Sequence, residues 1–314
     1  MLEKPKRVDL KLPRSWNQCT TEQLETIAAC IIKHTATADR FHPFDWQQVK
    51  TEIFFLFTNT EIISSEEREG DTLFLCQKAA GKKTRHNSNP VFGLYSWQVL
   101  SFIEQNLKWI DDEKQSLLVF PYRRLLYKWE WRFRYPFFRK RYFAPSELMQ
   151  DFTWQQYRHM QDYMSLFVKQ QNALMKVIQS VHDVRQTVDI QRQMLATRNA
   201  FLSILFHCER HPKLLRKIGE VQWQVILIWW GGMMHYLQQR YPRCFKSGDG
   251  GKKKKRPPNP LELYVSITAT VQKYIGLDEE KVNGQTFHVI LEQLERIAKE
   301  NEEMEKINKK HKHK

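Results

Sequence analysis

The sequence from Tyr157 to Val181, YRHMQDYMSLFVKQQNALMKVIQSV, is the strongest indicator of fold class in this chain. Apolar or nearly apolar residues recur in it three and four positions apart, which is the spacing of one face of an α-helix. They are Met160, Met164, Phe167, Leu174, Ile178 and Val181. Residues 146–211 contain neither glycine nor proline, so the usual helix breakers do not occur there. We expect one long helix or a helical hairpin, with its break near Thr187–Gln193. A continuous coiled coil is disfavoured because Gln171, Arg185 and Arg192 interrupt the heptads.

Helical patterns also dominate the sequence on either side of this segment. Thr20 and Gln23 have the spacing of a capping box at the start of a helix. Asp45 and Ser96 stand ahead of two further helical patterns, at 46–57 and 97–107, and we expect these residues to cap them. More helices are expected over residues 195–208, 214–239, 261–274 and 286–308.

Residues 64–90 depart from the helical pattern. They are polar, and a short strand-like segment at 72–76 within them predicts a small hairpin or excursion. The expected fold is therefore mainly α-helical with a small β excursion.

The distribution of glycine, proline and charge predicts the domain organisation. We expect a mainly helical globular body at 1–245 and a basic Gly/Pro linker at 246–260. A C-terminal helical pair at 261–308 and a disordered basic tail at 309–314 follow. So short a helical pair buries too little apolar surface to be stable alone, so it should dock on the body or on a partner.

Positive charge is concentrated in two places. The chain of 314 residues has 50 Lys and Arg against 35 Asp and Glu, which gives a net charge of +15. Tyr122–Phe143 contains eight Arg or Lys and one acid, and Lys252–Arg256 is a run of five cations. The candidate contacts to anions or nucleic acid are Arg132, Arg134, Arg139, Lys140, Arg141, Lys252, Lys253, Lys254, Lys255 and Arg256.

Aromatic and charged residues alternate strictly from Tyr127 to Tyr135, which predicts a strand with two different faces. In one interpretation the aromatic face is buried and the charged face is solvated. In the other, aromatic rings and arginines form a stacking surface for single-stranded nucleic acid. The alternation favours burial, because a nucleic-acid platform needs both residue types on one exposed face.

Signatures of enzymes, metal sites and membrane spans are weak or missing. No nucleotide-binding glycine loop and no nucleophile elbow occurs in the sequence. His207 and His211 are four apart, but Cys208 stands where a metalloprotease has glutamate. We therefore expect no catalytic residues, no metal and no cofactor. The longest apolar run, Val225–Met234, is half the length of a membrane span and is expected to be buried.

The five cysteines are dispersed and odd in number, which argues against a disulfide framework. Reduced thiols are typical of the cytoplasm, so we expect a cytoplasmic location.

Scattered motifs along most of the chain resemble a known class of proteins. Leu12-Pro-Arg-Ser-Trp16 followed by Thr20-Thr-Glu-Gln-Leu24 is similar to the opening of small tail-assembly proteins of long-tailed phages and prophages. Further similar segments are Phe120-Pro-Tyr with Ala144-Pro-Ser-Glu-Leu148, Phe152-Thr-Trp-Gln-Gln-Tyr157 and Tyr241-Pro-Arg-Cys-Phe245. The resemblance implies a tail assembly chaperone, active in the host cytoplasm, that binds the tape-measure or tail-tube protein. It brings no catalytic residues with it, and such a chaperone does not need the strong basic charge of this chain.

Two functions remain after these exclusions. The first is a non-enzymatic assembly protein whose C-terminal helices contact a partner helix. Its candidate partner-binding residues are Leu263, Ile267, Val271, Ile290 and Leu294. The alternative is a basic nucleic-acid-binding protein that uses residues 122–143 and 252–256. The sequence does not indicate an oligomeric state.

Overall fold

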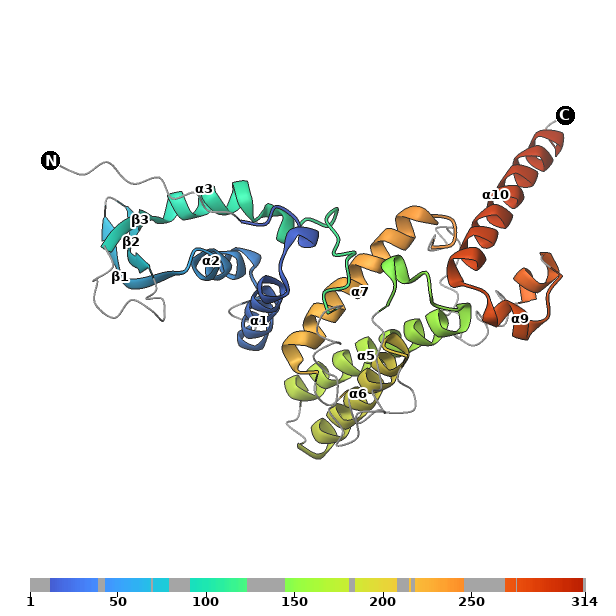
Figure 1. Ribbon diagram of the computed structural model, residues 1–314, viewed down its shortest axis with the longest axis horizontal. Helices are drawn as coiled ribbons and strands as arrows, with labels where there is room; N and C mark the ends of the chain where they lie inside the picture. The colour runs from blue at the N-terminus through green and yellow to red at the C-terminus, as the bar shows by residue number, and fades with distance from the viewer. Residues whose placement is uncertain are drawn as a thin grey trace, which may run out of the picture. The chain divides into compact units, whose positions relative to one another are not determined.

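The computed structural model is mainly α-helical and contains a small antiparallel sheet of three strands (Figure 1). It describes residues 12–38, 43–68, 70–78, 91–122, 145–180, 184–207, 215, 218–245, 269–274 and 276–312. The expected fold class is therefore confirmed. The expected strand at 127–135, the linker at 246–260 and all the candidate anion contacts lie outside the described residues.

The described residues fall into two compact units. Unit 1 combines the described part of Met1–Pro121 with Gly219–Gly232. Unit 2 combines the described part of Tyr122–Ile218 with that of Met233–Lys314. Helix α7 (Glu220–Arg240) thus contributes its first part to unit 1 and its last part to unit 2. This division differs from the expected one, which placed residues 1–245 in one body and the C-terminal helices in another.

The first two helices of unit 1 start at their predicted caps. Before α1 (Thr21–Thr37), the Thr20 hydroxyl accepts a hydrogen bond from Gln23 N (3.2 Å), and the Gln23 side chain accepts one from Thr20 N (2.9 Å). Before α2 (Trp46–Phe57), the Asp45 carboxylate accepts a hydrogen bond from Gln47 N. These bonds satisfy backbone N–H groups that the first turn of a helix leaves unpaired.

The core of unit 1 lies between α1, α2 and α3 (Ser96–Asn106). Ile27, Ile53 and Ile103, one from each helix, are completely buried. Two 3-10 turns, η1 (Trp16–Gln18) and η2 (Lys108–Ile110), bring Trp16 and Trp109 edge to face with ring centres 5.1 Å apart. Ser96 is the first residue of α3 and not its cap, because Tyr95 occupies the capping position.

The sheet of unit 1 has the strand order β1–β2–β3, with antiparallel neighbours. Its strands are β1 (Thr60–Arg68), β2 (Asp71–Lys78) and β3 (Val91–Tyr95). The central strand β2 includes the predicted segment 72–76 and buries Leu73 and Cys76. Nearly all of β1 is exposed, so it lacks the alternation that identifies a half-buried strand.

The apolar run that begins at Val225 belongs to α7, and its part in unit 1 buries Val225, Ile226, Trp229 and Trp230. The Trp229 ring meets Phe120 edge to face at 4.9 Å, and Trp229 Nε1 donates to Leu118 O (3.2 Å). A Cβ atom on Gly232 would lie 2.5 Å from Leu117 O. The helix can approach the backbone of Leu117 this closely because glycine has no side chain. No helix among the described residues is long and apolar enough to cross a membrane.

Unit 2 is built around a helical hairpin. Helices α5 (Trp154–Ser180) and α6 (Val184–Leu205) lie side by side, and the buried residues Phe167 and Val177 of α5 and Phe201 of α6 contribute to its interior (Figure 1). The break between the helices precedes the predicted one at Thr187–Gln193, which lies inside α6. Arg185 and Arg192 were interpreted as signs of the break, but they are exposed residues of a continuous helix.

The C-terminal helices α9 (Glu279–Gly284) and α10 (Phe287–Lys312) dock on the start of α5. Trp154 N donates to Gln285 O (2.7 Å), and Phe287 N donates to Phe152 O (3.1 Å). The rings of Tyr157 and Phe287 stack with centres 4.5 Å apart. These contacts place the C-terminal helices in unit 2. Helix α10 continues to Lys312, past the point where a disordered tail was expected.

Candidate functional site

The five predicted partner-binding residues have different surroundings. Leu263 and Ile267 lie outside the described residues. Val271 and Ile290 are completely buried, and Leu294 is half-buried. Val271 and Ile290 therefore pack against this chain's own residues. A partner that bound to α10 would therefore contact side chains of this helix other than Ile290.

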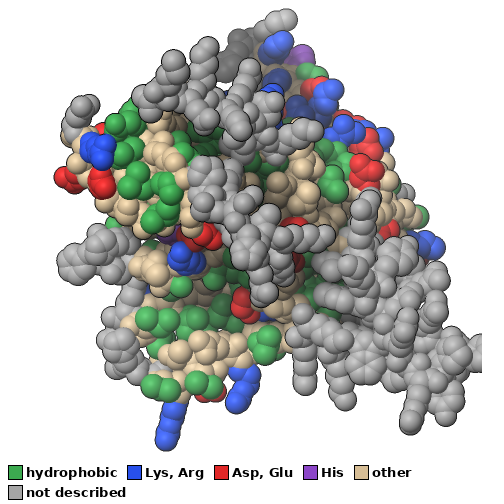
Figure 2. All heavy atoms as spheres, turned by 60° about the vertical axis from the view of Figure 1, so that its left-hand side comes forward, with side chains coloured by type: hydrophobic (Ala, Val, Ile, Leu, Met, Phe, Trp, Pro, Cys, Tyr) green, Lys and Arg blue, Asp and Glu red, His purple; other side chains and the backbone are tan. Residues whose placement is uncertain are grey.

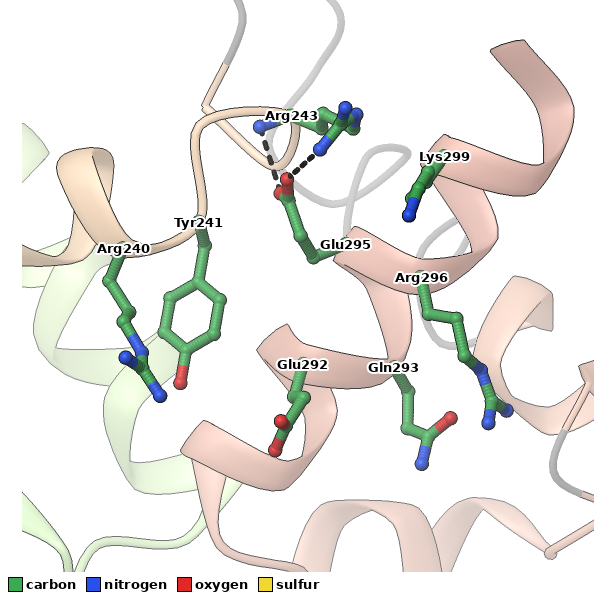
Figure 3. Close-up of a pocket in the computed structure, with 8 residues that line it drawn as sticks. All are labelled: Arg240, Tyr241, Arg243, Glu292, Gln293, Glu295, Arg296 and Lys299. Carbon is green, nitrogen blue, oxygen red and sulfur yellow. Dashed lines mark hydrogen bonds and ion pairs between the residues drawn. The ribbon is translucent and has the colours of Figure 1, made fainter. Parts of the chain in front are cut away.

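A charged depression of about 560 Å³ lies where the end of α7 meets α10 (Figure 3). The end of α7 and the turn after it contribute Arg240, Tyr241 and Arg243, and α10 contributes Glu292, Gln293, Glu295, Arg296 and Lys299. Four cations and two carboxylates line the depression, so it has an excess of positive charge. Sequence reasoning missed this site because its two halves are separated by about fifty residues.

Arg243 binds two carboxylates of α10 and so fastens the turn after α7 to that helix. Its guanidinium lies 2.9 Å from Glu295 and 3.1 Å from Glu302 (Figure 3 shows the first of these pairs). The backbone N atoms of Arg243 and Cys244 also donate to Glu295, at 2.8 and 3.2 Å. The contacts to both carboxylates raise the pKa of Arg243. Because the side chain and the backbone of this turn bind the same helix, we interpret the network as structural.

A second polar chain beside the depression orients His288. His288 Nε2 lies 2.8 Å from Leu148 O in the 3-10 turn η3 (Glu147–Met149). A carbonyl oxygen can only accept, so Nε2 carries the proton and donates it. The Tyr241 hydroxyl can then donate to His288 Nδ1, 3.2 Å away. Leu148 has a left-handed backbone (φ 53°), and the hydrogen bond from His288 holds this unfavourable conformation in place.

In unit 1, Cys30 and His34 stand one helical turn apart on α1, and His34 Nε2 lies 2.8 Å from Glu52 of α2. A nucleophilic thiol needs a lowered pKa and access to substrate. Burial, with a further contribution from the Glu52 charge, instead raises the pKa of the Cys30 thiol to about 11. Cys30 is also nearly inaccessible. We therefore interpret these residues as part of the α1–α2 packing.

Two further thiols and one histidine of the described residues also have structural surroundings. Burial raises the pKa values of the Cys19 and Cys244 thiols to about 12. His207 Nε2 lies 3.3 Å from Asp151, and its ring packs on Phe152. Within the described ranges, no group of three His, Cys, Asp or Glu side chains could hold a metal ion. His211 lies outside these ranges.

The C-terminal end of α10 has an exposed apolar surface that a partner could bind. Ile290 and Ile297 are buried and seven positions apart, and Met304 continues the same heptad. Met304 and Ile307 are 57% and 48% exposed. The same apolar row thus packs inside unit 2 in the first half of α10 and is solvent-exposed in the second. Extending the predicted 3–4 spacing by two turns would have identified these residues.

Hydrophobic side chains also reach the surface elsewhere, between charged ones (Figure 2). Trp97 and Leu100 of α3 are exposed in unit 1, as are Val168 and Met175 of α5 in unit 2. Comparisons with protein-family models, with curated proteins and with solved structures find no match to this chain.

Proposed function

We propose that this chain is a non-enzymatic assembly protein that binds a partner helix through the exposed end of α10. The observation that carries this proposal is the apolar row of α10, which continues past its contacts inside unit 2 to Met304 and Ile307. A free amphipathic helix face is the usual means by which one helix recognises another.

The charges near this row suit a helical partner. Glu303 and Glu305 are followed by Lys306 and Lys310 on the last turns of α10, so both signs of charge lie beside Met304 and Ile307. Charged residues beside an apolar seam select the partner and its orientation in coiled coils. A helix with complementary charges would therefore be favoured over a flat apolar surface.

The finer proposal concerns the identity of the partner. The resemblance of the sequence to phage tail-assembly proteins supports a tape-measure or tail-tube protein as partner, with assembly in the host cytoplasm. The alternative function, nucleic-acid binding, depends on residues 122–143 and 252–256. All but Tyr122 of these residues lie outside the described part of the chain.

Titration of purified tape-measure and tail-tube proteins from the same genome against the full chain tests this proposal. The double variant Met304→Glu/Ile307→Glu should bind about 10- to 100-fold more weakly, because two apolar side chains lose their burial in the complex. Val289→Glu is the matched control, since Val289 is an exposed apolar residue on the same helix. Unchanged affinity of the double variant, or no binding by the full chain, would refute the proposal.

A further inference from the structure

A second apolar row runs along each helix of the α5–α6 hairpin. It consists of Val168, Met175 and Ile178 on α5 and of Val184, Val188 and Leu195 on α6, which are between 44 and 73% exposed. Their spacings of three, four and seven residues are those of a heptad seam. Each helix therefore has one seam inside the hairpin and one that faces solvent.

The two exposed rows lie on the same side of the hairpin. On α5, Val168 and Ile178 directly follow Phe167 and Val177, which are buried. On α6, Leu195 directly follows Met194, which is half-buried. Successive residues of a helix are rotated by about 100° around its axis. On both helices the exposed row is therefore rotated in the same sense away from the buried residues inside the hairpin. Because the helices run antiparallel and face each other, this rotation brings both rows to one surface, here called the hairpin face.

A polar layer crosses the hairpin face. Gln171 takes the heptad position between Val168 and Met175, and Gln191 takes the one between Val188 and Leu195. Both are exposed and lie at about the same distance from the turn of the hairpin. An amide both donates and accepts hydrogen bonds, so a glutamine layer can pair with an identical layer. A polar layer in an apolar seam also fixes the register of a helix bundle.

We propose that the hairpin face binds the hairpin face of a second copy of this chain, which produces an antiparallel four-helix bundle with the glutamines in one layer. Two adjacent helices with an exposed apolar seam on one side are half of such a bundle. A two-fold interface also requires a self-complementary surface, which the glutamine layer provides.

The flanking charges select one orientation of the two copies. If α6 lies on α5 of the second copy, Lys176 of one chain faces Asp189 of the other at the same level, and Arg192 faces Asn172. If instead α6 lies on α6 of the second copy, Arg192 of one chain faces Arg192 of the other, and Lys176 of one chain approaches Lys169 of the other. The first orientation brings one pair of opposite charges together and leaves Arg192 beside a neutral amide, whereas the second brings like charges together, so the first is the one we assign.

The size of the face sets the expected strength. Three to four turns of two adjacent helices bury on the order of 1,000 Å² across both copies, which is the lower end for stable interfaces. We therefore expect a dimer that dissociates in the micromolar range.

Sedimentation equilibrium of the full chain over about 1–100 μM tests the proposal. The chain should shift from monomer to dimer, and Met175→Glu should raise the dimer dissociation constant by more than about tenfold. Leu166→Glu is the matched control, because Leu166 is an exposed apolar residue on the opposite side of α5. It should leave the dimer intact. A monomer throughout, or a dimer that tolerates Met175→Glu, would overturn the proposal.

A charge exchange tests the orientation and does not depend on how the glutamate variant folds. Lys176→Glu and Asp189→Lys should each weaken the dimer at low salt, and the double variant should regain it. Both positions are exposed, and the ion pair of Asp189 with Arg192 on the same helix is long (4.0 Å) and solvated, so the melting temperature of the fold should change little. Single variants that dimerise like the parent, or a double variant without recovery, would contradict the assigned pairing.

Discussion

Replacing Gly232 by alanine should destabilise the protein, although glycine is normally unfavourable inside a helix. An added Cβ would lie 2.5 Å from Leu117 O and 2.9 Å from Leu117 N, so backbone on one side must move. Such overpacking costs about 1–3 kcal/mol. The gain in helix propensity offsets about 1 kcal/mol of that cost. The net loss in the free energy of unfolding is therefore about 0–2 kcal/mol.

The adjacent Gly231 is the matched control, because a Cβ there would meet nothing within 4 Å. Gly231→Ala should stabilise the protein by about 0.5–1 kcal/mol. Urea unfolding followed by far-UV circular dichroism would measure both variants. The expected difference between them is about 1–3 kcal/mol. If Gly232→Ala is as stable as Gly231→Ala, the close approach of α7 to Leu117 is refuted.

Three further predictions concern other parts of the chain. Burial tends to raise the pKa of the Asp151 carboxyl, but hydrogen bonds from His207 and Ser146 outweigh it and lower the pKa to about 2. The unfolded value is about 3.9, so this carboxylate stabilises the fold above about pH 4, and the contribution is lost as the pH falls to 2. Asp151→Asn should therefore flatten the dependence of unfolding free energy on pH in this window, and an unchanged profile would contradict the assignment. Arg243→Ala should lower the melting temperature more than Arg243→Lys, because lysine keeps the charge but loses the forked contact to Glu295 and Glu302; equal melting temperatures for the parent and both variants would show that the network does not stabilise the fold. In the expected strand at 127–135, Trp131→Ala should cost about 3–5 kcal/mol and Arg132→Ala less than about 0.5 kcal/mol; a Trp131→Ala protein that melts like the parent would mean that the aromatic face is not buried.

Local signals in the sequence predict the helices of this protein well. The cap formed by Thr20 with Gln23 and the one formed by Asp45 depend on residues two or three positions apart, so they are readable without knowledge of the fold. The same holds for Gly276, which lies just beyond the helix expected over residues 261–274 and adopts the left-handed conformation, with φ 72°, that favours glycine at the end of a helix.

Features that depend on distant contacts were not predictable in the same way. The stack of Phe287 on Tyr157 joins the C-terminal helices to α5, and nothing near either residue indicates the other. The break of the hairpin was misplaced because Arg192 seemed to end an apolar row. It is in fact an exposed residue beside a second row, which is visible only once the inner face of α6 is known. The charged depression at Arg243 likewise exists only because α7 and α10 meet.

The central claim is that this chain recognises another protein through apolar helix surface. The most direct measurement compares its binding to purified tape-measure protein and to single-stranded DNA and RNA at 50 and 200 mM salt. We expect binding to the protein whose affinity changes less than about tenfold between the two salt concentrations, since burial of apolar surface is not screened by ions. Nucleic-acid binding that weakens about a thousandfold over the same range, without binding to the protein, would contradict the account.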